Sequence, residues 1–218
     1  MTTRRDFLAA SSAAGALAFP AASFNRLLRR PYRHRQVFGA HRATNGTVFE
    51  QMVQSLNGYE YDLEEGPGTL HVAAVLYGSA AAMGLDDELW RRYRLAAVLT
   101  ARDDDVEAAT VGREGNPFLH GRRAFDPSVS REDPRHPSHD DSIRALARRG
   151  ASLFICEIAL TQLAAFIAAN PHFAGGRAQD GVLADLRAGV VTDAMRVPSG
   201  IAALNAAQEN RFTYVAAS

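Results

Sequence analysis

A short, almost uninterrupted apolar run constrains the fold of this chain more than any other feature. It spans residues 70–77, where Val72, Ala73, Ala74, Val75 and Leu76 follow one another without a charge. A run of this length is typical of a strand that is buried on both faces. Such strands occur mainly in parallel sheets that are covered by helices. The run therefore predicts an α/β protein.

Strand and helix patterns alternate along the rest of the chain. Strands are expected near residues 36–40, 70–77, 151–156, 190–197 and 211–215. Helices are expected near residues 47–57, 86–92, 140–149, 158–169, 179–187 and 199–209. In the first of these helices Thr47 and Glu50 form a capping-box pattern, and Gly58 supplies a stop. The alternation predicts one layered α/β domain, with a mostly parallel five-stranded sheet and right-handed crossovers.

The N-terminus has the pattern of an export signal. Arg4 and Arg5 stand directly before a weakly apolar stretch, residues 7–19, which is rich in Ala, Ser and Leu. This arrangement is typical of twin-arginine signals. We expect residues 1–23 to be the signal and residues 24–218 to form a single domain in the periplasm or outside the cell. A fortuitously basic N-terminus on a cytosolic protein is the alternative, and an uncleaved signal would act as a membrane anchor.

The charge balance, the absence of Lys and the absence of several motifs exclude some classes of function. The chain has 24 basic and 24 acidic residues, so it has no bulk charge that would attract nucleic acid. Every basic residue is Arg, and the absence of Lys excludes chemistry that needs a Schiff base. There is also no Gly-rich phosphate loop, no Gly-x-Ser-x-Gly elbow and no Cys pair. No cofactor is predicted.

Cys156 is the only cysteine, and it stands at the end of an apolar strand and the start of a helix. Backbone N–H groups at a helix N-terminus stabilise a thiolate or a persulfide anion. Open α/β folds also place their ligands at the carboxyl ends of strands. The alternative is that Cys156 is a small apolar core residue, as free cysteines usually are. Glu157 follows directly, and a carboxylate there is expected to disfavour the thiolate.

Two histidines are expected in or near the sheet. His71 begins the 70–77 strand and is expected to be a hydrogen-bonded core or pocket residue. His41 follows the first strand, as Cys156 follows the third, so the two residues are expected at the same sheet edge. His41 is therefore a candidate proton carrier.

Residues 100–138 are rich in charge, Gly and Pro, and they predict a long surface insertion or lid. At its end His136, His139, Asp140 and Asp141 are close enough in sequence to share a metal ion, with His120 joining from the same insertion. The spacing matches no recurring zinc pattern, and the two aspartates are also explained as acids at a helix N-terminus. No metal site is therefore predicted here, although it stays open as a hypothesis.

The C-terminal third resembles the DsrE/DsrF-like family. The resemblance covers residues 149–156, 159–160, 185–190, 197–201, 208 and 214–215, and more weakly residues 36–39, 66–71 and 76–78. It implies a flavodoxin-like fold, homo-oligomers, and a cysteine that carries sulfur as a persulfide between partner proteins. Cys156 matches the family's cysteine. The chain departs from small cytoplasmic members in its 100–138 insertion and in Glu157, where an amide or a small residue is more usual.

Three hypotheses follow from these observations. The first is an exported sulfur-relay or thiol-handling protein that uses Cys156 and exchanges sulfur with a donor or acceptor protein. The second is a non-catalytic module that binds a small molecule or a protein. The third is a metal-binding protein that depends on His136 and His139. Whether the protein is an enzyme stays open, because a sulfur carrier need not turn over a substrate alone.

Overall fold

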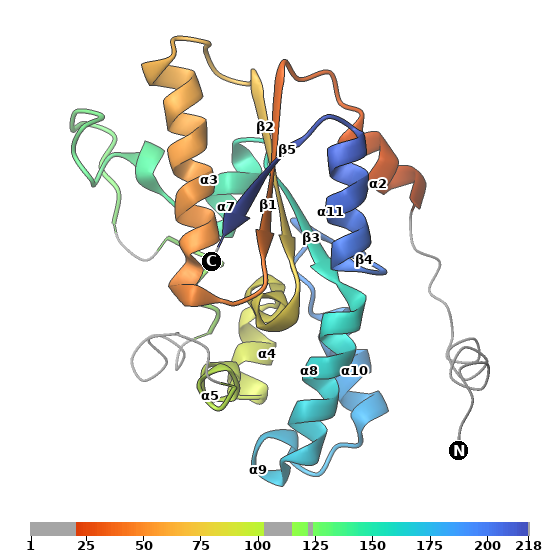
Figure 1. The fold of residues 1–218 in the computed structure, drawn as a ribbon. Helices are drawn as coiled ribbons and strands as arrows, with labels where there is room; N and C mark the ends of the chain where they lie inside the picture. The colour runs from red at the N-terminus through yellow and green to blue at the C-terminus, as the bar shows by residue number, and fades with distance from the viewer. Residues whose placement is uncertain (1–20, 103–114, 122–123, 218) are drawn as a thin grey trace.

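A five-stranded sheet forms the centre of the computed structural model, which describes residues 21–102, 115–121 and 124–217 (Figure 1). The strands are β1 (His34–Ala40), β2 (Leu70–Leu76), β3 (Ser152–Cys156), β4 (Ala194–Val197) and β5 (Thr213–Ala217). Their spatial order is β4-β3-β2-β1-β5, and all neighbouring strands are parallel. The predicted α/β class is confirmed, and the layering is that of a flavodoxin-like fold.

Helices cover both faces of this sheet (Figure 1). One face carries α2 (Ala21–Leu28) and α11 (Gly200–Glu209), whose apolar side chains pack on Val75 and Phe154. The other face carries α3 (Thr47–Asn57) and α7 (Ile143–Arg148). All seven residues of β2 are buried, as the uninterrupted apolar run predicts.

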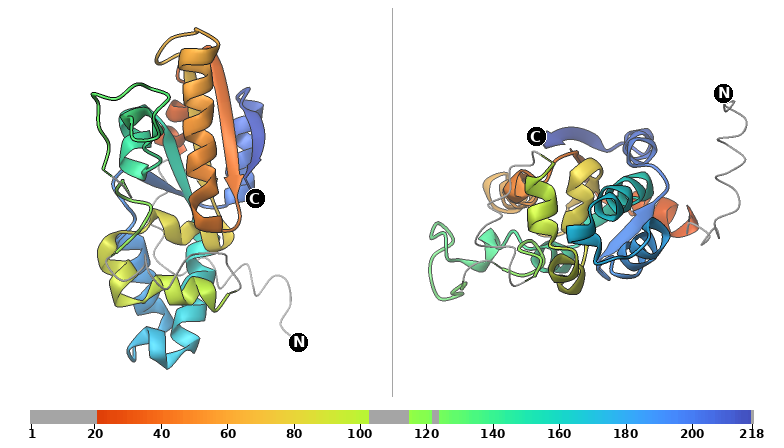
Figure 2. Two further views of the ribbon diagram at one scale, coloured as in Figure 1. Left: turned by 90° about the vertical axis from the view of Figure 1, so that its left-hand side faces the viewer. Right: turned by 90° about the horizontal axis from the view of Figure 1, so that it is seen from below.

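A group of helices lies beyond the carboxyl ends of the strands, in the lower half of Figure 1. It comprises η3 (Gly78–Gly84), α4 (Asp87–Arg92), α5 (Leu95–Thr100), α8 (Glu157–Ala169), α9 (Pro171–Ala174) and α10 (Gln179–Ala188). Trp90 is fully buried within the group, and its indole N–H donates to the Ala82 carbonyl at 2.9 Å. Figure 2 shows the group from below and from the side. The carboxyl ends of β2 and β3 are therefore partly covered.

Of two local expectations for α3, the N-terminal one is wrong and the C-terminal one holds only in part. Its N-terminal cap is Gly46, at φ 85°, and the Thr47 hydroxyl donates to the Thr44 carbonyl within η1 (Thr44–Gly46), so no capping box forms. The α-helix ends at Asn57 with Gly58 as its C-terminal cap, as expected, but the Gly58 φ of −57° is helical and does not turn the chain away. The path goes on as a π-helical turn, η2 (Gly58–Asp62). The strand expected at residues 190–197 is also shorter, and Val190 forms only an isolated antiparallel bridge with Leu85.

The described part of the 100–138 segment is not entirely a surface insertion. Phe118 is buried between Phe49 and Trp90, and Leu119 is buried beside it. The Asn116 amide is also buried and donates to the carbonyl oxygens of Met83 and Leu85, both at 2.6 Å. These residues anchor the segment in the core, whereas most of residues 124–137 are exposed. Residues 103–114 and 122–123 lie outside the described part.

The N-terminal helix was not expected from the sequence. Phe24 and Leu28 of α2 are buried, and the Phe24 ring meets the Phe154 ring edge-on at 5.0 Å. The proposed export signal, residues 1–23, lies almost wholly outside the described residues. Within the described residues no helix combines the length and the apolar character that a membrane crossing requires.

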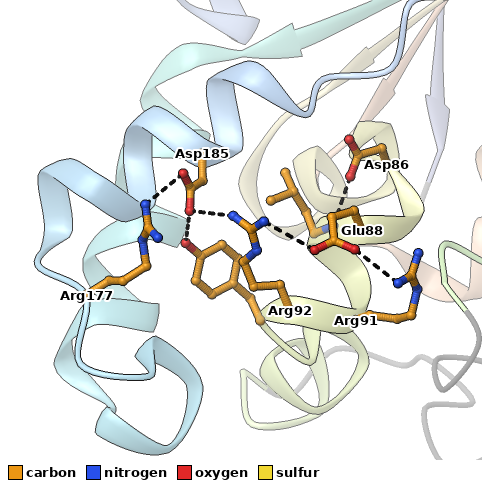
Figure 3. A network of polar contacts seen from close by, with 8 residues as sticks. Asp86, Glu88, Arg91, Arg92, Arg177 and Asp185 are labelled. Carbon is orange, nitrogen blue, oxygen red and sulfur yellow. Dashed lines mark hydrogen bonds and ion pairs between the residues drawn. The ribbon is translucent and has the colours of Figure 1, made fainter.

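A polar network joins α4 to α10 (Figure 3). The Asp185 carboxylate accepts hydrogen bonds from the Tyr93 hydroxyl, from Arg92 and from Arg177, and both arginine contacts measure 3.0 Å. Arg92 also contacts Glu88 at 3.2 Å within α4. Because α10 leads into β4, this network helps to position the strand that lies beside β3.

Candidate functional site

Cys156 is the last residue of β3, and α8 begins directly after it. It is a free thiol, and its exposed fraction is 5%. The residue therefore stands where the sequence predicted it, at a strand end and a helix start. Its side chain is nevertheless almost completely enclosed by the core.

The Cys156 sulfur contacts the N-terminus of a different helix from the one that follows it. The backbone N–H of Gly200 donates to Sγ at 3.1 Å, and Gly200 is the first residue of α11. The Ser199 side chain caps the same helix by accepting from the Ala202 N–H at 3.4 Å. Because a helix N-terminus carries partial positive charge, this contact favours an anionic sulfur.

Gly200 makes this approach sterically feasible. A Cβ atom at position 200 would lie 2.8 Å from the Tyr77 Cβ and 3.3 Å from the Cys156 Cβ. The first of these distances is too short for two carbon atoms. A larger residue would therefore push the α11 N-terminus away from the sulfur.

Glu157 does not present an uncompensated charge beside Cys156. Its carboxylate accepts hydrogen bonds from Arg187 at 2.6 Å and from Arg196 at 2.9 Å. All three side chains are about one quarter exposed. The two guanidinium groups more than balance the carboxylate, so the expected penalty on a thiolate is offset.

Tyr77 and His41 extend the site along the carboxyl ends of β2 and β1. Tyr77 packs against Gly200, and its ring centroid lies 5.2 Å from that of His41. Burial, together with the nearby Tyr214, raises the pKa of Tyr77. His41 thus lies at the expected sheet edge, but no hydrogen bond joins it to Cys156, and its role as a proton carrier stays a prediction.

An open pocket of about 500 Å³ adjoins the N-terminus of α11. Its lining includes Ser199, Ile201, Leu204, Gln208 and Tyr214, and none of its described lining residues is charged. Ile201 is 62% exposed. The pocket therefore suits a neutral, partly apolar group next to the Cys156 site.

The residues of the metal hypothesis are engaged in local contacts. His136 Nδ1 pairs with the Ser138 hydroxyl at 2.9 Å, and His139 Nε2 lies 2.7 Å from the Arg131 carbonyl. His120 contacts Asp87 instead, with its Nε2 3.2 Å from the Asp87 Oδ2. Among the described residues no group of three or more His, Cys, Asp or Glu side chains is arranged to hold a metal ion.

His71 is a hydrogen-bonded core residue, as expected. Its Nε2 lies 2.9 Å from the Ser152 hydroxyl, and its ring stacks on Tyr32 at 4.7 Å. Burial lowers the pKa of His71 to about 4, and Arg30 and Arg35 add to this effect. His71 is the second residue of β2, near the amino ends of the strands, whereas Cys156 ends β3 at the opposite edge of the sheet.

Comparison with known proteins gave no match to a family model, to a curated protein or to a solved structure. The candidate site therefore rests on its geometry. The family resemblance includes Gly200, Arg187 and Tyr77, but sequence reasoning assigned them no role at the Cys156 site. It missed Arg196 altogether.

Proposed function

We propose that this protein is an exported, DsrE-like sulfur carrier in which Cys156 holds sulfur as a persulfide. The observation that carries the proposal is the Gly200 N–H, 3.1 Å from the Cys156 sulfur at the start of α11. The same N–H would stabilise both the attacking thiolate and the persulfide anion. The flavodoxin-like fold and the position of Cys156 at a strand end agree with the family resemblance.

Loading of the carrier is a simple displacement. With thiosulfate as donor, the Cys156 thiolate attacks the outer sulfur, a new S–S bond forms, and the S–S bond of thiosulfate breaks. Sulfite leaves with the electron pair, so charge balances without an added oxidant. Unloading is the analogous attack by an acceptor thiolate on the terminal sulfur, which releases the Cys156 thiolate.

Because Cys156 has a low exposed fraction, sulfur loading requires a local movement of the protein. At 5% exposure the sulfur is accessible to a small donor only after the α11 N-terminus or the neighbouring Tyr77 moves. Ile158 and Ile201 stand on the first turns of α8 and α11 and are 52% and 62% exposed. Exposed apolar residues in this position would suit a docking protein or a second copy of the chain.

Mass spectrometry of the intact protein tests the proposal. We expect the mature chain to gain one sulfur atom or more after incubation with thiosulfate, and alkylation to trap the loaded thiol. Cys156→Ser, the matched control, must gain none. If native Cys156 resists both sulfur loading and alkylation while the unfolded chain is alkylated normally, it is a core residue and the carrier function is excluded.

The export and assembly parts of the proposal need separate measurements. N-terminal sequencing of protein from the periplasm would locate the mature start, which we place after residue 23. Light scattering of the purified protein would show whether it forms a homo-oligomer. A protein that stays in the cytosol with its N-terminus intact would contradict the export signal.

A second function is favoured by the uncharged pocket beside α11. In this alternative the protein is a non-catalytic module, and the pocket binds a small molecule or a partner's side chain. Cys156→Ser would then leave binding unchanged, whereas Tyr214→Ala would weaken it. The metal hypothesis receives no such support from the described residues.

A further inference from the structure

The charge of the chain is distributed unevenly, although its total is zero. Residues 7–49 contain six arginines and no Asp or Glu. Five of these arginines lie within residues 26–35, which include the end of α2 and the start of β1. Residues 50–218 carry 16 arginines and 23 acidic residues. A basic N-terminal segment on an otherwise acidic chain is typical of a protein that binds an anionic partner through that segment.

Helix α2 presents three of these arginines on one face, and this arginine stripe consists of Arg26, Arg29 and Arg30. Residues three and four positions apart lie side by side on a helix. The helical path reaches Arg29, because its N–H donates to the carbonyl four residues earlier at 3.1 Å. All three arginines are exposed, whereas Phe24 and Leu28 of the same helix are buried against the sheet. In Figures 1 and 2, α2 lies at the periphery of the molecule, where a large partner has access to the stripe.

The arginine stripe is not neutralised within the described part of the chain. None of its guanidinium groups forms an ion pair or a hydrogen bond with another described residue. Neighbouring arginines are used, since Arg33 pairs with Glu65 and Arg35 donates to two backbone carbonyl oxygens. Asp193 lines a small pocket together with Arg30, but no ion pair joins them. Even with Asp193 counted against it, the stripe keeps net positive charge for a partner outside the chain.

We propose that the arginine stripe docks the protein on an anionic lipid bilayer. Neighbouring side chains on the stripe start about 5–6 Å apart, so the three guanidinium groups reach the phosphates of one flat surface together. The apolar residues of α2 are used in the core, so the helix does not insert, and attachment is electrostatic and reversible. The choice of a membrane rests on the proposed export, because the signal proposed for residues 1–23 ends in the first turn of α2 and brings this helix to the bilayer.

A nucleic acid fits the charge distribution less well than a bilayer. A flexible polyanion follows positive charge around a protein, and here the excess of acid in residues 50–218 repels it. A bilayer is flat and meets one side of the molecule only. The stripe can therefore contact lipid phosphates while the acidic part of the chain stays away from them.

Cosedimentation of the full chain with lipid vesicles tests this proposal. Two kinds of vesicle are compared at low ionic strength: phosphatidylcholine alone, and phosphatidylcholine mixed with an equal amount of phosphatidylglycerol. The apolar stretch 7–19 contributes alike to both kinds, so the readout is the ratio of the two dissociation constants. We expect the anionic vesicles to bind about a hundredfold more tightly, because each arginine near an anionic surface contributes about fivefold. This preference should fall as salt is added.

Variants separate the stripe from the net charge of the protein. The triple variant Arg26→Gln, Arg29→Gln and Arg30→Gln should lose at least about thirtyfold of the preference for anionic vesicles. All three side chains are exposed, so the variant should fold, which thermal unfolding checks. The matched control replaces by Gln three exposed arginines outside α2, which changes the net charge equally: Arg91, Arg135 and Arg144. The control should keep the preference of the wild type.

Three results would overturn the lipid-docking stripe. They are equal affinity for the two kinds of vesicle, an equal loss in the control variant, and displacement from anionic vesicles by duplex DNA at an equal concentration of phosphate. The last result would identify the partner as a nucleic acid. The measurement uses the purified full chain, so it does not depend on export, and Cys156→Ser should bind vesicles as the wild type does. Failure of the sulfur carrier and failure of the stripe are therefore distinguishable.

Discussion

The backbone N–H of Gly200 points at the sulfur of Cys156 from 3.1 Å, although the two residues are 44 positions apart in the chain. The contact depends on the absence of a side chain at position 200, where a Cβ would lie 2.8 Å from Tyr77. It ties the end of β3 to the start of α11. A substitution at Gly200 therefore tests how this contact affects the reactivity of Cys156, while the cysteine itself is unchanged.

Gly200→Ala should slow alkylation of Cys156 by iodoacetamide about tenfold relative to the wild type when each is measured under conditions where the protein stays folded. The reason is the lost hydrogen bond, because a bond to a charged group contributes about 1.5–3 kcal/mol. Gly181→Ala is the matched control, since a Cβ there would meet only Arg177 Nε, at 3.8 Å. Equal rates in the two variants would show that the N–H does not activate the sulfur. Faster alkylation of Gly200→Ala would instead show that the α11 N-terminus mainly shields the thiol.

The arginine pair around Glu157 is expected to control the same reactivity. Removing Arg187 and Arg196 together leaves the Glu157 carboxylate uncompensated, and thiosulfate loading should fall several-fold. The side chains are partly exposed, so each pair contributes at most about 1 kcal/mol. Adding Glu157→Gln to the double variant should restore loading. If the triple variant loads as poorly as the double variant, the arginines act by positioning β4 and not by charge.

The place of Cys156 could be predicted because local patterns determine it: an apolar run predicts β3, and the apolar residues that follow, up to Asn170 and Pro171, predict α8. The Gly200 contact could not, since it forms only when α11 packs on the face of the sheet opposite α3. Local patterns were also misleading where a neighbour competed with them. Thr47 was expected to cap α3, but Gly46 adopts the left-handed conformation there, and the Thr47 hydroxyl turns to Thr44.

The structure of the 100–138 segment could also be predicted only in part from the sequence. Its composition indicates an exposed loop, and most of residues 124–137 are exposed. The buried anchors Asn116 and Phe118 could not be recognised, because their partners come from η3 and α4 and are distant in sequence.

Asp185→Asn should lower the free energy of unfolding by about 1–2 kcal/mol, because Tyr93 and two arginines lose their shared acceptor charge. Burial alone would raise the pKa of Asp185, but the hydrogen bonds from Tyr93 and Arg92 outweigh it, and the pKa is lowered. A carboxylate with a lowered pKa stabilises the fold above its unfolded pKa and loses that contribution as the pH falls through the folded value. Urea unfolding at several acidic pH values measures both effects. A wild type and an Asp185→Asn variant with the same slope against pH would contradict the network's role.

His71 makes stability depend on pH over a different range. Its pKa is lowered from 6.5 to about 4, so the unfolded chain binds the proton more readily than the folded one. Stability should therefore fall as the pH is lowered from about 6.5 to 4, by up to about 3 kcal/mol, at 1.36 kcal/mol per pKa unit. His71→Gln should flatten this slope, even if it lowers stability overall. His172→Gln, at an exposed site on α9, should keep it.

Phe24 makes α2 part of the folded domain. Its ring is buried against Phe154 at 5.0 Å, so Phe24→Ala should cost about 3 kcal/mol of unfolding free energy. Asn25→Ala, at the next and exposed position of the same helix, should change stability by less than about 0.5 kcal/mol. The comparison bears on export, because a signal cut before Phe24 keeps the Phe24 ring on Phe154, whereas a cut after Phe24 removes it. Thermal unfolding of chains that begin at Ala22 and at Arg29 measures the difference, and equal midpoints would show that α2 contributes nothing to the fold.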